Sequence, residues 1–128
     1  MKSKRYITLL LTAVALTLAG CGGKDSHITV SDSQIVGLWQ KNNSQEYWRY
    51  NADHSGVTWD EGEDISEEES NLTYTWSIAE DVLTHVFTGA MANQAVPKVY
   101  TVKDINGSFM KWEDDYGISH TLTKVTEQ

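Results

Sequence analysis

A single cysteine, Cys21, has the position that suggests the most specific chemistry in this sequence of 128 residues. It follows a basic start, MKSKR, and then fifteen uncharged residues that end in the small pair Ala19-Gly20. A basic segment, an apolar segment shorter than the roughly 20 residues of a membrane span, and small residues at the end are typical of a secretory signal peptide. The sequence therefore predicts a signal peptide over residues 1–20.

The stretch Leu18-Ala19-Gly20-Cys21 resembles a bacterial lipobox, in which the cysteine thiol receives a diacylglyceryl group. The resemblance implies cleavage before Cys21, so that the lipidated cysteine becomes the mature amino terminus. One acyl chain binds a membrane only marginally, whereas at least two anchor a protein stably. We therefore expect the membrane as a partner, through acyl chains on Cys21. A free cysteine beside an ordinary cleavage site is the alternative.

The residue after the cysteine bears on location. Gly22 is not the aspartate that, in the enteric sorting rule, retains lipoproteins in the inner membrane. The resemblance therefore implies a lipid-anchored protein of the bacterial outer membrane, on either its periplasmic face or the cell surface. Residues 21–34 are polar and contain glycine and serine, which indicates a flexible tether before a domain over residues 35–128.

The charge balance excludes two classes of partner. Removal of residues 1–20 leaves seven basic and eighteen acidic residues, a formal balance of −11. Nucleic acids and anionic lipid surfaces both attract basic patches. We therefore expect no nucleic-acid binding and no electrostatic docking on a membrane.

Aromatic residues recur on the predicted strands and are the candidates for contacting a ligand. Side chains alternate between the two faces of a strand, so Trp48 and Tyr50 share one face while Arg49 points to the other. One interpretation is a cup in which aromatic rings stack on an apolar or sugar-like ligand. The other, favoured for most of these residues, is a core, because aromatic side chains dominate small cores. The candidates are Trp48, Tyr50, Trp59, Tyr74, Trp76, Tyr100 and Trp112.

An acidic run, DEGEDISEEES at residues 60–70, has enough carboxylates to suggest calcium, which prefers oxygen ligands. It lacks the spacing of an EF-hand loop, so we predict a solvated loop in which like charges repel. The four histidines lack metal-binding spacing, although His85 and His120 could meet across a barrel. No nucleophile elbow, phosphate-binding glycine loop or paired-cysteine motif is present. The sequence predicts no metal, no cofactor and no enzymatic activity.

The elements that position these residues have a period of two. In Leu72–Ile78 large apolar side chains alternate with small hydroxyl-bearing ones, which is typical of a half-buried strand. Asn106-Gly107 is a strong hairpin signal. Regularly spaced short strands with hairpin turns indicate a sandwich or a barrel. Eight are predicted, at residues 36–40, 46–50, 57–59, 72–78, 82–87, 98–104, 109–113 and 118–125.

The opening VGLWQ places Gly37-x-Trp39 on the first strand, as lipocalins do. With the later strand motifs (46–61, 72–78, 96–102 and 112–125), the chain resembles the lipocalin-like domain of small lipoproteins from gut-dwelling Gram-negative bacteria. The resemblance implies a shortened, eight-stranded, antiparallel up-and-down barrel in which the tryptophan closes one end. It carries over no catalytic residues and no ligand.

Two functions fit this barrel. The first is binding of a small apolar or amphipathic ligand, which a continuous cavity of about 300 Å³ or more, lined by Trp48, Trp76 and Trp112, would favour. The second is a structural or interaction module, accessory to an outer-membrane complex with unknown protein partners. A filled barrel with an exposed apolar patch would favour this second function.

Overall fold

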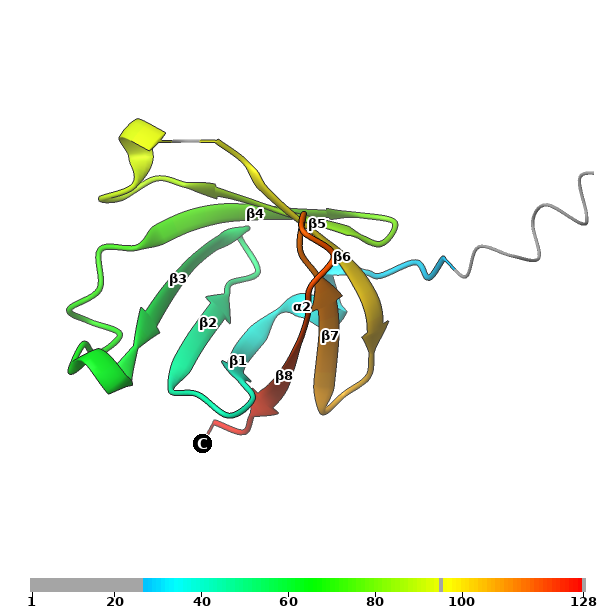
Figure 1. Ribbon diagram of the computed structural model, residues 1–128, viewed down its shortest axis with the longest axis horizontal. Helices are drawn as coiled ribbons and strands as arrows, with labels where there is room; N and C mark the ends of the chain where they lie inside the picture. The colour runs from blue at the N-terminus through cyan, green and yellow to red at the C-terminus, as the bar shows by residue number, and fades with distance from the viewer. Residues whose placement is uncertain (1–26, 95, 128) are drawn as a thin grey trace, which may run out of the picture.

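The chain forms a closed barrel of eight antiparallel strands, which confirms the predicted all-β fold (Figure 1). The computed structural model describes residues 27–94 and 96–127; the predicted signal peptide and Cys21 lie outside the described residues. Each strand pairs with the next and β8 pairs with β1, so the up-and-down order is also confirmed. The strands are β1 (Gly37–Lys41), β2 (Glu46–Tyr50), β3 (Ser55–Asp60), β4 (Thr73–Ala79), β5 (Val82–Phe87), β6 (Lys98–Ile105), β7 (Phe109–Glu113) and β8 (Ser119–Val125).

Alternation of large and small side chains forms the wall of the barrel. On β4, Tyr74 and Trp76 are buried in the core, while Thr75 and Ser77 are exposed on the outside.

Side-chain hydrogen bonds stabilise the turns of the hairpins. The Asn106 carboxamide oxygen, for example, accepts hydrogen bonds from the backbone N–H groups of Ser108 and Phe109 between β6 and β7.

One end of the barrel is closed by Trp39, the position that the Gly-x-Trp resemblance implies. Its indole is fully buried and donates a hydrogen bond of 2.8 Å to the carbonyl of Ile35. The Lys124 ammonium lies 5.1 Å from the centre of the Trp39 ring and donates to the Val36 carbonyl. Gly37 has a φ of 139°, and a Cβ atom there would lie 2.6 Å from the Lys124 side chain, so this turn requires glycine.

The segment before β1 packs across this closed end. A short helix, α2 (Asp32–Ile35), buries Ile35 completely, and Val30 is also buried. The backbone N–H of Val30 donates to the Glu80 carbonyl in the β4–β5 turn. Packing therefore begins before residue 35, where the sequence analysis placed the start of the domain, because Val30 of the expected tether lies in the core and Ile28 packs against it. In the described part of the chain, no helix combines the length and apolar character that crossing a bilayer demands.

Strands β3 and β4 separate towards the opposite, open end. They are paired only from Ser55 to Val57 on β3, and a long loop then joins them (Figure 1). This loop contains a short 3₁₀ helix, η1 (Glu61–Glu63). A second 3₁₀ helix, η2 (Ala92–Gln94), lies in the connection between β5 and β6. The Arg49 guanidinium on the outer face of β2 bonds Glu67 of the acidic loop. The expected solvated loop is thus partly ordered by an ion pair.

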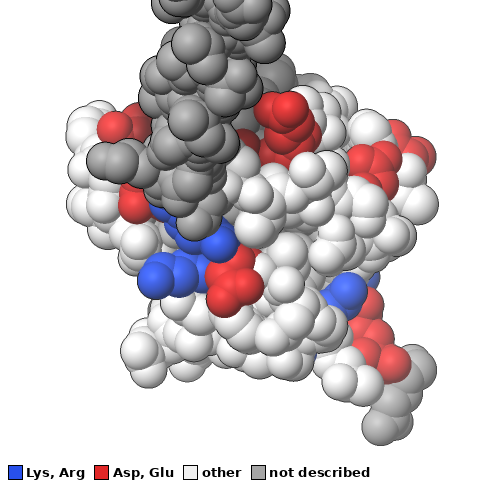
Figure 2. Space-filling model, turned by 90° about the vertical axis from the view of Figure 1, so that its right-hand side faces the viewer, with Lys and Arg blue, Asp and Glu red and all other residues white. Residues whose placement is uncertain are grey.

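Acidic side chains are spread over the surface. Figure 2 shows the face beside the β4–β5 turn, where acidic groups lie in several separate places among uncharged residues, with few basic groups between them.

Candidate functional site at the open end of the barrel

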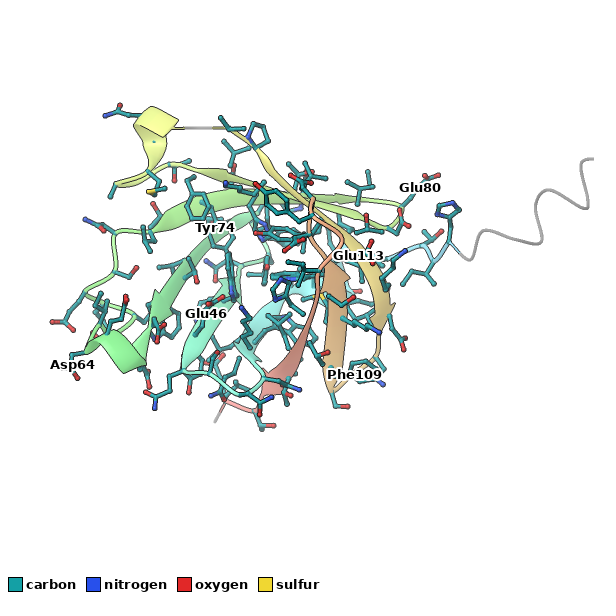
Figure 3. The ribbon with its side chains drawn as sticks, viewed as in Figure 1. Glu46, Asp64, Tyr74, Glu80, Phe109 and Glu113 are labelled. Atoms are coloured by element: carbon teal, nitrogen blue, oxygen red, sulfur yellow. The ribbon has the colours of Figure 1, made fainter. Side chains whose placement is uncertain are left out.

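The barrel interior is filled by aromatic side chains packed around His85. Tyr74, labelled in Figure 3, is one of these aromatic residues. His85 on β5 is fully buried, and its Nε2 lies 2.7 Å from the Tyr50 hydroxyl. Its ring also contacts Trp48, Tyr74, Tyr100 and Trp112, with centroids 4.9–5.7 Å apart. The predicted aromatic core is therefore present, and the protein's own side chains occupy most of the barrel interior.

Burial sets the charge of this interior. It lowers the pKa of His85 to about 3 and raises the pKa values of Tyr50 and Tyr74, because desolvation disfavours each charged form. His85 is therefore neutral at physiological pH. Its Nδ1 has no hydrogen-bond partner among the described residues.

Above this core, the open end holds a pocket of about 260 Å³, here called the mouth pocket. Its base is aromatic: Tyr100 and Trp112 stack with centroids 4.5 Å apart, and Trp48 meets Trp112 edge to face at 5.6 Å. Tyr116 in the β7–β8 turn also lines this pocket and is 88% exposed. The mouth pocket therefore offers aromatic surface beside water.

The rim of the mouth pocket carries charges of both signs. Lys41 and Lys98 line it together with Glu46, Asp114 and His120. The Asp114 carboxylate lies 3.0 Å from the His120 ring, and this hydrogen bond lowers the pKa of Asp114. A polar rim around an aromatic base is suited to an amphipathic molecule.

A second hollow of about 600 Å³, the side pocket, lies where β3 and β4 separate. It is lined by the end of β3, by residues 69–72 and by parts of the acidic loop, including Ile65. Glu46 and Trp48 line both pockets, so the two hollows adjoin across β2. The side pocket thus adds space beside the expected cup, at the place where β3 and β4 are no longer paired.

The candidate residues fall into three groups. Trp48, Tyr100 and Trp112 meet in the mouth pocket. Trp59 lines the side pocket and stacks on Tyr47, the outward-facing residue opposite it on β2. The remaining three are core residues that line neither the mouth pocket nor the side pocket: Tyr50, Tyr74 and Trp76.

The hydrogen bonds of these core residues explain their burial. The Tyr74 hydroxyl donates to the carbonyl of Arg49, and the Trp76 indole N–H donates to carbonyls in the β2–β3 turn. The mouth pocket is lined by Trp48 and Trp112 but not by Trp76. The mouth pocket and the side pocket both lie at the open end.

No family model, curated protein or solved structure matches this chain. The lipocalin-like assignment and the lipobox therefore stay predictions from the sequence.

His85 forms a hydrogen bond with Tyr50 inside the barrel and His120 forms one with Asp114 at the rim, so each of these histidines has a partner of its own. Among residues 27–94 and 96–127, no three His, Cys, Asp or Glu side chains are placed to share a metal ion. Sequence reasoning missed the central position of His85, although His85 shares the inward face of β5 with Leu83 and Phe87.

Proposed function

We propose that this chain is a membrane-anchored, lipocalin-like lipoprotein of the outer membrane whose open end binds a small apolar or amphipathic ligand without catalysis. The observation that carries this proposal is the mouth pocket, in which stacked Tyr100 and Trp112 form an aromatic base below a charged rim. Ligand pockets are typically concave and apolar, with a few polar groups that fix orientation. At about 260 Å³ the mouth pocket is slightly smaller than the roughly 300 Å³ expected of a ligand cavity, so it suits a very small molecule or part of a larger one.

Binding at the mouth is tested with N-phenyl-1-naphthylamine, a neutral apolar fluorophore that brightens when it leaves water. We expect the purified domain to bind it saturably and Tyr100→Ala to weaken binding about tenfold, because an aromatic stacking partner contributes roughly 1 kcal/mol or more. The matched control is Phe109→Ala, which removes an aromatic ring from the opposite, closed end. Absence of saturable binding by the wild-type domain would overturn the proposal.

The anchor is tested with Cys21→Ser, which removes the thiol that the lipid requires. We expect the variant to leave the membrane fraction and to keep the circular dichroism spectrum of a folded barrel. Full membrane retention, with an uncleaved amino terminus, would instead indicate a spanning helix.

The interaction module remains the second candidate because of the outer wall of β4, β5 and β6. Neighbouring positions on this wall carry uncharged side chains in an otherwise acidic protein: Thr75, Ser77, Val82, Thr84, Val99 and Thr101. Such a wall has few charges to desolvate on contact with another protein. Native mass spectrometry of protein purified from its host distinguishes the candidates, since a retained small molecule supports ligand binding and a retained subunit supports the module.

A further inference from the structure

We propose that the side pocket receives a positively charged organic molecule, an alkyl- or arylammonium compound whose apolar part enters the gap between β3 and β4. This inference rests on the proposed function, because the side pocket adjoins the mouth pocket along Glu46 and Trp48. It adds the chemical class of the ligand.

Hydrogen bonds between β3 and the chain that returns to β4 form one side of the side pocket. The backbone N–H of Thr58 donates to the Leu72 carbonyl, and the Ser70 hydroxyl donates to the Thr58 carbonyl at 2.7 Å. These bonds hold the returning chain beside β3 while leaving a hollow of about 600 Å³, more than twice the volume of the mouth pocket. The apolar surface comes from Trp48, Trp59, Ile65 and Leu72.

Two indoles give this hollow surfaces that attract cations. Trp48 lies on the inner side of the wall, and Trp59 lies on the outer side, where one face stacks on Tyr47 at 5.3 Å. The electron-rich face of tryptophan attracts ammonium groups more strongly than other aromatic rings do. Apolar contact and attraction for a cation are therefore available in one place.

The charges around the side pocket have one sign. Among the described residues, no basic side chain lines it. The four carboxylates that line it are those of Glu46, Asp60, Glu63 and Glu69. In Figure 3 Glu46 lies on β2 and Asp64 follows η1, with β3 running between them. Arg49 lies on the outer face of β2 but is held by Glu67 and Glu127. An anionic ligand would meet repulsion here, whereas a cation would be attracted.

Three of these carboxylates also serve the fold. Glu46 accepts the indole N–H of Trp48, and Asp60 accepts the backbone N–H of Gly62. Glu69 accepts from Ser66, which lowers the pKa of Glu69 and keeps it ionised. The exposed carboxylate of Glu63 forms no hydrogen bond with another described residue, so its charge can be removed with least effect on structure.

The test uses three probes with an octyl-length chain and different head charges: octyltrimethylammonium, octanol and octanoate. The two ions are kept below their micelle concentrations and octanol below its solubility limit. Binding affinities are measured by isothermal titration calorimetry at low salt and at 150 mM salt. We expect octyltrimethylammonium to bind most tightly, octanol less tightly and octanoate least. At low salt the affinities of the first two should differ about tenfold. Higher salt should narrow that difference, because exposed charges are screened.

The variant is Glu63→Gln, with Glu68→Gln as the matched control in the same loop. Glu68 is exposed and lines neither pocket. We expect Glu63→Gln to weaken octyltrimethylammonium binding about three- to fivefold and to leave octanol binding unchanged, since one partly screened charge is lost. Glu68→Gln should leave both affinities unchanged.

The outcomes separate this inference from the function on which it rests. Equal affinities for the three probes, or equal effects of the two variants, would overturn the cationic ligand while saturable N-phenyl-1-naphthylamine binding kept the ligand-binding function. Preferential octanoate binding would also overturn it and would indicate the lysines of the mouth pocket, Lys41 and Lys98. Failure of all four probes to bind would overturn both.

Discussion

Replacing Trp39 with alanine should lower the free energy of unfolding by about 3–5 kcal/mol. The indole is fully buried at the closed end, and its loss leaves a cavity that the rigid strand ends cannot fill. The Ile35 carbonyl would lose its donor, and the Lys124 ammonium would lose the ring beneath it. Because small domains are stable by about 5–15 kcal/mol, this change removes a large share of the total.

Urea unfolding followed by circular dichroism measures the effect of Trp39→Ala. Trp39→Phe keeps part of the packing but loses the indole N–H, so it should fall between the wild type and Trp39→Ala. Tyr116→Ala is the control, since this exposed aromatic side chain should contribute less than about 0.5 kcal/mol to stability. Equal stabilities of Trp39→Ala and Tyr116→Ala would show that Trp39 does not close the barrel.

Acidification should destabilise the barrel through His85, beginning near pH 6.5. Burial lowers the pKa of His85 from about 6.5 to about 3, so at intermediate pH the unfolded chain binds a proton that the folded chain does not. The stabilisation is complete above pH 6.5 and is lost as the pH falls, by up to about 1.4 kcal/mol per pH unit. The rings that face His85 are uncharged at neutral pH and offer no carboxylate to stabilise the protonated form: Trp48, Tyr50, Tyr74, Tyr100 and Trp112.

The measurement is the free energy of unfolding at several pH values between 7.5 and 5, for the wild type and for His85→Gln. Glutamine does not titrate and retains a group that can bond the Tyr50 hydroxyl. His85→Gln should be less stable at neutral pH but should show a much flatter dependence below pH 6.5. Identical slopes for the two proteins would mean that His85 is not the group responsible.

The fold was predictable because its local signals agree with its overall architecture. Alternation in Leu72–Ile78 placed β4 within one residue of Thr73–Ala79, since each large side chain on that strand needs the core. The Asn106-Gly107 signal identified the β6–β7 hairpin. Closure of β8 on β1 followed from the number of strands and from the Gly-x-Trp resemblance.

The site was less predictable because it depends on where the regular pattern stops. Strand alternation does not reveal that β3 leaves β4 after Val57, and this separation creates the side pocket. Trp59 was expected to line a cup inside the barrel, but its register with Tyr47 places it on the outer face of the wall. Burial of Trp59 comes from the acidic loop, whose course depends on long-range contacts such as that between Arg49 and Glu67.

The bond between Val30 and Glu80 has a consequence for how the barrel stands on a bilayer. It fixes the amino-terminal segment to the β4–β5 turn, at the closed end that also carries Trp39. If Cys21 is acylated, the six residues 22–27 join it to Ile28, a reach of at most about 25 Å for a fully extended chain. The closed end would then face the lipid and the open end would point into the aqueous phase. A ligand would then enter the open end from the aqueous phase. The barrel would receive it from, or pass it to, other molecules in solution, and would not take it directly from the membrane.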